Sequence, residues 1–168
     1  MFSYNKIRLV FFALLVIVGV SCQRSANTDK IPIKEIIPAN IIFPKGVKSP
    51  AENFTGTAWV NRLVQKDETG TYSIGNVVFE PGARTNWHLH PAGQTLIVID
   101  GKGLYQEKGK PVRVIGKGDV IIAASNIEHW HGATQDSSLI HIAITNLKDG
   151  GVKWLQAVSN DEYNAIDK

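Results

Sequence analysis

The sequence is poor in sulfur and nearly balanced in charge. Among its 168 residues there is one cysteine, Cys22, and one methionine. A single cysteine excludes any disulfide within one chain, and a chain of this length can build the core of one domain without one. Lysine and arginine number 18 against 15 acidic residues, and no basic cluster occurs beyond the N-terminal residues. We therefore expect no nucleic-acid partner.

Long hydrophobic runs are also scarce, and the one present is Leu9–Val20. It follows Lys6 and Arg8 and is shorter than the roughly 20 residues that a transmembrane helix needs. A charged start followed by such a run is typical of a secretory signal, and the position of Cys22 resembles a bacterial lipobox. We predict that residues 1–22 are a signal peptide with a lipobox.

Lipidation of Cys22 would anchor the protein to a membrane through its N-terminus. The folded part would then be exported, as a membrane-anchored lipoprotein or a periplasmic protein. A plain secretion signal with an incidental cysteine and an uncleaved anchor are the alternatives.

Residues 23–50 have the composition of a tether followed by an arm. Gln23–Lys30 is polar, and prolines interrupt the short apolar pieces between Ile31 and Pro50. This spacing excludes a long helix and favours an irregular or edge-strand arm, which could add a strand to a partner. Residues 51–168 would form the domain itself.

After Phe54, short segments rich in β-branched and aromatic residues alternate with turn signals such as Asp100-Gly101. Many short strands at regular spacing predict an all-β sandwich or barrel. One short C-terminal helix is expected, with Ser159 or Asn160 capping Asp161–Ala165. The expected strands are Ala58–Val64, Tyr72–Glu80, Thr85–His90, Gln94–Asp100, Gly103–Glu107, Val112–Ile115, Asp119–Ala123, Glu128–Ala133 and Leu139–Asn146.

All five histidines lie between His88 and His141, and four form the pairs His88/His90 and His129/His131. Side chains alternate along a strand, so each pair directs both imidazoles to one face. Any one of these histidines alone would more ordinarily be a hydrogen-bonded core residue. Two same-face pairs predict a transition-metal site, although imidazole suits several metals and does not name one.

The same parity separates pocket residues from packing residues. His141, Ala143 and Thr145 share one face of their strand, whereas Trp87 and Trp130 point away from the histidine face. We therefore expect the two tryptophans to pack on the outside of the barrel.

Two stretches resemble the two motifs of the cupin family. The first runs from Gly82 through His88-Leu89-His90 and Gln94 to Gly101, with Gln94 where most cupins carry glutamate. The second runs from Gly118-Asp119-Val120 to His129. The resemblance implies the cupin double-stranded β-helix, a jelly-roll barrel, and a homodimer.

Further segments are similar to one small bacterial subgroup of cupins. They are Phe79–His88, Gly93–Val98 and His129–Ala133. The subgroup includes cupins related to carboxymuconolactone decarboxylase proteins and the manganese-dependent cupin hydroxynitrile lyases. The resemblance implies a divalent metal, manganese with iron, zinc or nickel as alternatives. It implies the metal ligands His88, His90, Gln94 and His129, the catalytic pocket histidines His131 and His141, and the substrate-pocket residues Val77, Ala143 and Thr145.

A glutamine ligand shapes the expected chemistry. Gln94 is a neutral donor, so a site of three histidines and one glutamine leaves the ion its full positive charge, which favours Lewis-acid work over one-electron cycling. A proton acceptor must then come from His131 or His141.

Three functions follow as hypotheses, all with a small-molecule substrate or ligand. The first is a hydroxynitrile-lyase-like enzyme that converts a cyanohydrin to an aldehyde and cyanide. The second is a metal-dependent dioxygenase or other oxidoreductase, which oxygen consumption would reveal. The third is a non-catalytic exported cupin that binds a metal or a small ligand.

Overall fold

The computed structural model describes residues 42–65 and 70–166, and all of them belong to one compact unit, Ala39–Lys168. The predicted signal peptide, Cys22 and most of the predicted tether and arm lie outside the described residues, so those statements stay predictions. Within the described ranges, no helix is long and apolar enough to cross a membrane.

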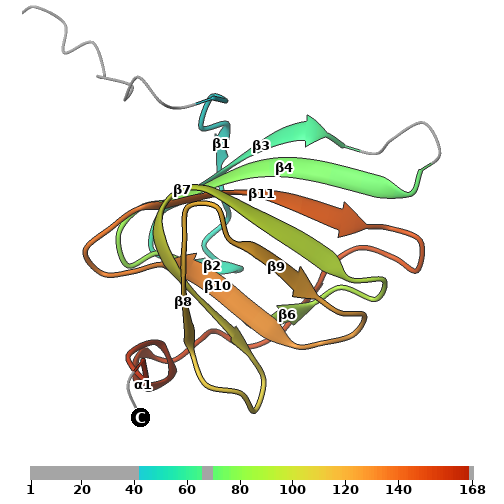
Figure 1. Ribbon diagram of the computed structural model, residues 1–168. Coiled ribbons are helices and arrows are strands. Elements are labelled where there is room, and N and C mark those ends of the chain that lie inside the picture. The colour runs from blue at the N-terminus through green and yellow to red at the C-terminus, as the bar shows by residue number, and fades with distance from the viewer. Residues whose placement is uncertain (1–41, 66–69, 167–168) are drawn as a thin grey trace, which may run out of the picture. The chain divides into compact units, whose positions relative to one another are not determined.

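The described residues form antiparallel strands and one short helix, which confirms the predicted all-β class with a C-terminal helix (Figure 1). In chain order the elements are β1 Val47–Lys48, β2 Phe54–Thr55, β3 Ala58–Val64, β4 Tyr72–Phe79, β5 Arg84–Thr85, β6 His88–Leu89, β7 Gln94–Glu107, β8 Arg113–Gly116, β9 Val120–Ala123, β10 His129–Ala133, β11 Leu139–Asn146, β12 Lys153–Trp154 and α1 Asn160–Tyr163.

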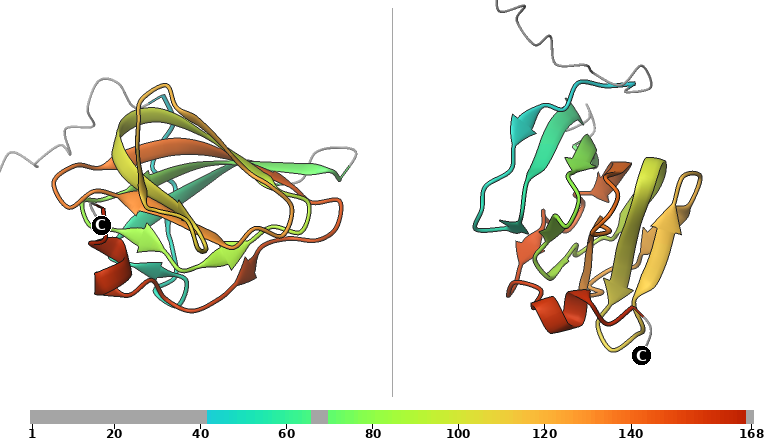
Figure 2. Two further views of the ribbon diagram at one scale, coloured as in Figure 1. Left: turned by 60° about the horizontal axis from the view of Figure 1, so that its bottom comes forward. Right: turned by 90° about the vertical axis from the view of Figure 1, so that its left-hand side faces the viewer.

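The strands of this unit form one curled sheet with two halves. Half A contains β1, β3, β4, β11, the first part of β7 and β9, whereas half B contains the rest of β7 with β8, β10, β5, β6, β2 and β12. Strand β7 therefore connects the halves, as Figures 1 and 2 show. The result is the curled arrangement of a jelly roll, as predicted.

The prediction of two strands separated by a turn at Asp100-Gly101 is wrong, because β7 continues through these residues. Gly101 has a φ of 81°, and a Cβ at this position would lie 2.0 Å from the carbonyl oxygen of Ser138. The glycine therefore allows β7 to bend past β11 at close range, and the register with β11 shifts between Ile140 and His141.

The predicted strand Thr85–His90 is divided in the structure into β5 and β6. Between them, the side-chain amide of Asn86 donates to the carbonyl oxygen of Glu52 at 2.8 Å. The interruption leaves the orientation of the pair intact, since His88 and His90 line the same cavity.

Two apolar clusters lie on opposite sides of half B. The interior cluster includes the fully buried Phe79, Leu96 and Leu139. The outer cluster contains Trp87 and Trp130 together with Leu104, Val112, Val158 and Tyr163. The prediction that the two tryptophans pack away from the histidine face is confirmed.

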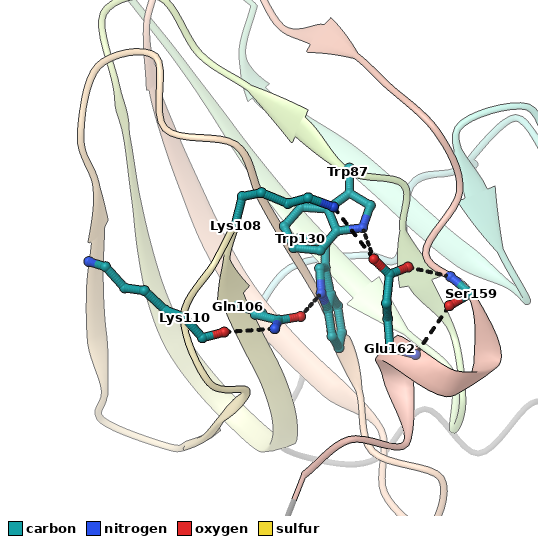
Figure 3. A network of polar contacts seen from close by, with 7 residues as sticks. All are labelled: Trp87, Gln106, Lys108, Lys110, Trp130, Ser159 and Glu162. Atoms are coloured by element: carbon teal, nitrogen blue, oxygen red, sulfur yellow. Dashed lines mark hydrogen bonds and ion pairs between the residues drawn. The ribbon is translucent and has the colours of Figure 1, made fainter. Parts of the chain in front are cut away.

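Helix α1 closes the outer cluster. Ser159 is its N-cap and forms a capping box with Glu162, in which each side chain bonds the other residue's backbone N–H. Glu162 also accepts a hydrogen bond from Nε1 of Trp87 at 3.2 Å (Figure 3). The helix thereby holds the strand that carries His88 from outside.

Candidate metal centre

His88 and His129 form the centre of the histidine group. Their strands pair so that the two residues lie opposite each other, and their ring centroids are 4.3 Å apart. Nδ1 of His88 lies 3.0 Å from the carbonyl oxygen of Asn86, and Nδ1 of His129 lies 2.8 Å from that of Ile127. A carbonyl oxygen can only accept, so each Nδ1 carries the proton and each neutral ring keeps a free lone pair on Nε2.

His131 is close to this pair. Ring nitrogens of His88, His129 and His131 all lie within 4.8 Å of one another, which is near enough for one ion to contact three of them. His131 also has a second partner, because its Nδ1 lies 3.2 Å from Nε2 of His141.

His90 is the least satisfied histidine of the group. It is 4% exposed, and neither of its ring nitrogens has a hydrogen-bond partner among the described residues. Its ring centroid lies 5.3 Å from that of His88 and 5.7 Å from that of His129. A buried imidazole without partners costs free energy, and an ion bound beside it would remove that cost.

Gln94 presents its oxygen to the same point. Its amide nitrogen donates to Oγ1 of Thr145 at 3.1 Å, and its Oε1 lies 3.3 Å from Nε2 of His129. Both atoms of this last pair are acceptors, because the proton of His129 is on Nδ1. Two lone pairs at this distance repel each other unless a cation lies beside them, so the donor set fits a metal ion.

Burial keeps all five imidazoles neutral. It lowers the pKa of His88 and His131 well below the usual 6.5, with further lowering by the neighbouring His129 and His141 respectively. Burial also lowers the pKa of His129, and it lowers the pKa of His90 and of His141 to about 4. Neutral imidazole is the form that binds metals and accepts protons.

A cavity of about 130 Å³ opens beside the histidines. Among the predicted site residues it is lined by Val77, His88, His90, Gln94, His131, His141 and Ala143. Thr145 is not in this lining and is the hydrogen-bond partner of Gln94, and His129 is not in the lining either but is grouped with His88 and His131.

Sequence reasoning missed four lining residues, Phe54, Thr85, Val152 and Trp154. Phe54 and Trp154 belong to two-residue strands at opposite ends of the described chain, and their rings lie 5.5 Å apart. Strand parity carries no signal for such short elements, because one or two residues show no alternation.

Arg84 is not part of the site. Its Nη2 donates to the carbonyl oxygen of Val158 at 3.1 Å and to Oδ1 of Asn160 at 2.9 Å, and its guanidinium lies over the ring of Tyr163. The side chain fixes the C-terminal segment to half B.

The chain is similar to known proteins of one family. The family described as Cupin domain matches residues 75–145. An (R)-mandelonitrile lyase from Granulicella tundricola is 43% identical over 117 residues, which cover 69% of this chain and 89% of that protein.

Two solved structures show the same fold. A cupin-like protein from Thermotoga maritima has 50% sequence identity and a TM-score of 0.70, with 73% of this chain and 94% of that chain covered. A conserved protein with a double-stranded β-helix domain from Klebsiella pneumoniae has 20% identity and a TM-score of 0.53, with 70% and 97% covered. The second likeness concerns the fold alone.

Proposed function

The chain belongs to the cupin family, and from this premise we propose that it is a metal-dependent lyase that cleaves a cyanohydrin into an aldehyde and hydrogen cyanide. The observation that carries the proposal is the pair of facing acceptors, Gln94 Oε1 and His129 Nε2, beside the unpartnered ring of His90. The relative named (R)-mandelonitrile lyase supports an aromatic cyanohydrin as the substrate.

We assign the metal to His88, His90, Gln94 and His129, and we propose manganese as the native ion. Three imidazoles and an amide oxygen are neutral donors. A divalent ion held by them keeps its positive charge, which would polarise a substrate oxygen or stabilise an anionic leaving group.

The chain's own acid–base group is the pair His131 and His141. If Nδ1 of His131 donates to Nε2 of His141, the other ring nitrogen of His131 is free to accept a proton. His141 then acts by holding the ring of His131 in one orientation and tautomer. The lowered pKa of His131 keeps it unprotonated at neutral pH and makes its protonated form a ready donor.

The reaction balances with these groups alone as proton carriers. His131 takes the hydroxyl proton of the cyanohydrin, the oxygen forms a double bond to carbon, and the carbon–carbon bond breaks with its electron pair on cyanide. Protonated His131 then returns the proton to cyanide. The products are one aldehyde and one hydrogen cyanide, and the protein is unchanged.

The test is benzaldehyde release from mandelonitrile by manganese-loaded protein, combined with metal analysis of two variants. We expect His131→Ala to lose at least about a hundredfold in kcat and to keep its metal, because general base catalysis contributes on the order of 10²–10⁴. We expect His90→Ala to lose the metal.

Each result has a clear contrary. If His90→Ala kept its metal and His131→Ala lost it, His131 would be a metal ligand in place of His90, as its grouping with His88 and His129 allows. No benzaldehyde from fully loaded wild-type protein would refute the lyase proposal. Oxygen uptake with phenolic or alkenyl substrates would support the dioxygenase hypothesis.

A further inference from the structure

We propose that Trp154 sets the size limit of the cavity and restricts its organic occupant to a molecule with a single ring. The inference rests on the proposed function in so far as it takes this cavity as the binding site. It adds the residue that determines which substrates fit.

Trp154 forms an aromatic wall of the cavity next to the metal centre. Strand β12 pairs with β6 so that Trp154 lies opposite His88, and the two ring centroids are 5.0 Å apart. On its other side the indole contacts Phe54, whose ring centroid lies 5.5 Å away. Because Trp154 carries the largest side chain in the lining, its removal enlarges the cavity more than any other truncation.

The segment that carries Trp154 is held firmly. The backbone N–H of Leu155 donates to the carbonyl oxygen of Trp87 at 2.8 Å, and the N–H of Trp87 donates to that of Gln156 at 3.0 Å. Further along, α1 is bound to Trp87 through Glu162 (Figure 3). The backbone next to Trp154 is thus fixed, and the contacts of the indole with Phe54 and His88 keep its ring at the wall of the cavity.

The volume of the cavity fits one ring. It measures about 130 Å³, and an apolar cavity of about 150 Å³ in another protein accommodates benzene. A fused pair of rings needs more space than a single ring, and we expect the wall at Trp154 to exclude it.

The lining of the cavity combines apolar side chains with a few polar groups. Apolar groups from Phe54, Val77 and Ala143 face a ring, while the histidines and Gln94 offer hydrogen bonds to a short polar substituent. The expected ligand is therefore a single ring with a hydroxyl-bearing carbon.

The experiment measures binding of two inert probes, benzyl alcohol and 2-naphthalenemethanol, to the manganese-loaded full chain by calorimetry. Wild-type protein is expected to bind the one-ring alcohol and to discriminate against the two-ring alcohol by at least roughly tenfold. Trp154→Ala should bind the two-ring alcohol more tightly and the one-ring alcohol more weakly, which reverses or abolishes the preference. Trp154→Phe should fall between them.

Trp59→Ala is the matched control. Trp59 lies on β3, outside the cavity lining, with its Nε1 donating to Glu80 at 3.2 Å. This variant should leave both affinities unchanged. Metal content and thermal unfolding of each variant establish that the site is intact, and Trp154→Phe carries the test if the alanine variant does not fold.

The inference is overturned if Trp154→Ala or Trp154→Phe keeps the wild-type ratio, if wild-type protein binds both probes equally, or if it binds neither. Turnover separates this from the proposed function. Protein that binds benzyl alcohol selectively but releases no benzaldehyde from mandelonitrile contradicts the proposed function alone. Protein that cleaves the phenyl and the naphthyl cyanohydrin equally well contradicts the size limit alone.

Discussion

The ring nitrogens of the two tryptophans on the outer face of half B have hydrogen-bond partners, whereas some ring nitrogens on its inner face have none. On the outer face, Nε1 of Trp130 donates to Oε1 of Gln106 at 2.8 Å, and Nε1 of Trp87 donates to Glu162. On the inner face, the equally buried His90 has no partner for either ring nitrogen, and His129 directs a lone pair at the oxygen of Gln94. Figure 3 shows the outer network.

This difference in hydrogen bonding distinguishes side chains that stabilise the fold from side chains that are available to a ligand. Buried polar atoms in proteins are nearly always paired, so the two unpaired ring nitrogens of His90 need a cause. The outer face has the arrangement expected of a structural layer. The unpaired ring nitrogens of the inner face lower the stability of the fold, and we attribute their presence to ligand binding.

The largest expected effect is the loss of stability at acid pH caused by the buried histidines of the inner face. The pKa of His90 and of His141 is about 4 in the folded chain, compared with 6.5 for an exposed histidine. Between these pH values the unfolded state binds more protons, so the free energy of unfolding of metal-free protein falls as the pH decreases from 6.5 to 4. One such histidine accounts for about 3 kcal/mol. Urea unfolding at several pH values measures the fall.

The pH window distinguishes the histidines from the carboxylates. Hydrogen bonds lower the pKa of partly exposed acids such as Glu107, where Lys110 is the first cause, so their stabilising contribution is lost only below about pH 4.5. A free energy of unfolding that stays flat between pH 6.5 and 4.5 would show that the inner histidines are protonated in the folded state. Manganese should preserve this dependence and extend it to lower pH, because it holds its ligands unprotonated in the folded state while the same histidines still bind protons in the unfolded state.

Truncation of a tryptophan on the outer face should lower the free energy of unfolding almost as much, without affecting metal binding. Trp130 is fully buried in the outer cluster, and Trp130→Ala is expected to lower the free energy of unfolding by about 3–5 kcal/mol. Its neighbours His129 and His131 stay on the other side of β10, so manganese should still bind at one ion per chain. Denaturant unfolding and metal analysis measure the two quantities separately.

Trp130→Phe is the control for the size of the side chain. It keeps a ring in the cluster and loses the hydrogen bond to Gln106, so its cost should be clearly smaller. If Trp130→Ala folded with native stability but could not bind manganese, the outer face would be part of the metal site and the comparison would fail.

Alternation was the part of the structure that the sequence could predict. Along β11, His141 and Ala143 line the cavity and Leu139–Asn146 is the strand that was expected. A long strand repeats its pattern often enough to define a face. The same logic places Trp130 outside, because histidines flank it on both sides in the sequence.

The sequence could not predict the features that depend on long-range geometry. Asp100-Gly101 has the residues of a turn, yet β7 passes through it because β11 lies close enough to require a glycine. Trp154 reaches the cavity only because β12 pairs with β6, and the sequence gives no register for a two-residue strand. Both features depend on neighbours far away in the chain.

Removal of the unpartnered imidazole should give the smallest effect and the most telling one. In metal-free protein, His90→Leu replaces a buried ring whose nitrogens have no partner, so stability should stay equal or rise by about 1 kcal/mol. His88→Leu, the matched control, leaves the carbonyl oxygen of Asn86 without its donor and should lower stability by about 1–2 kcal/mol. Both variants should lose manganese binding. Urea unfolding of the chelator-treated proteins compares them, and a loss of stability in His90→Leu as large as in His88→Leu would mean that His90 is an ordinary packed core residue. If His90→Leu stabilises the metal-free protein and His88→Leu destabilises it, the two changes in stability have opposite signs although both residues bind one metal. The ring of His90 would then lower stability because it serves only as a ligand, whereas the ring of His88 would also stabilise the fold through its hydrogen bond.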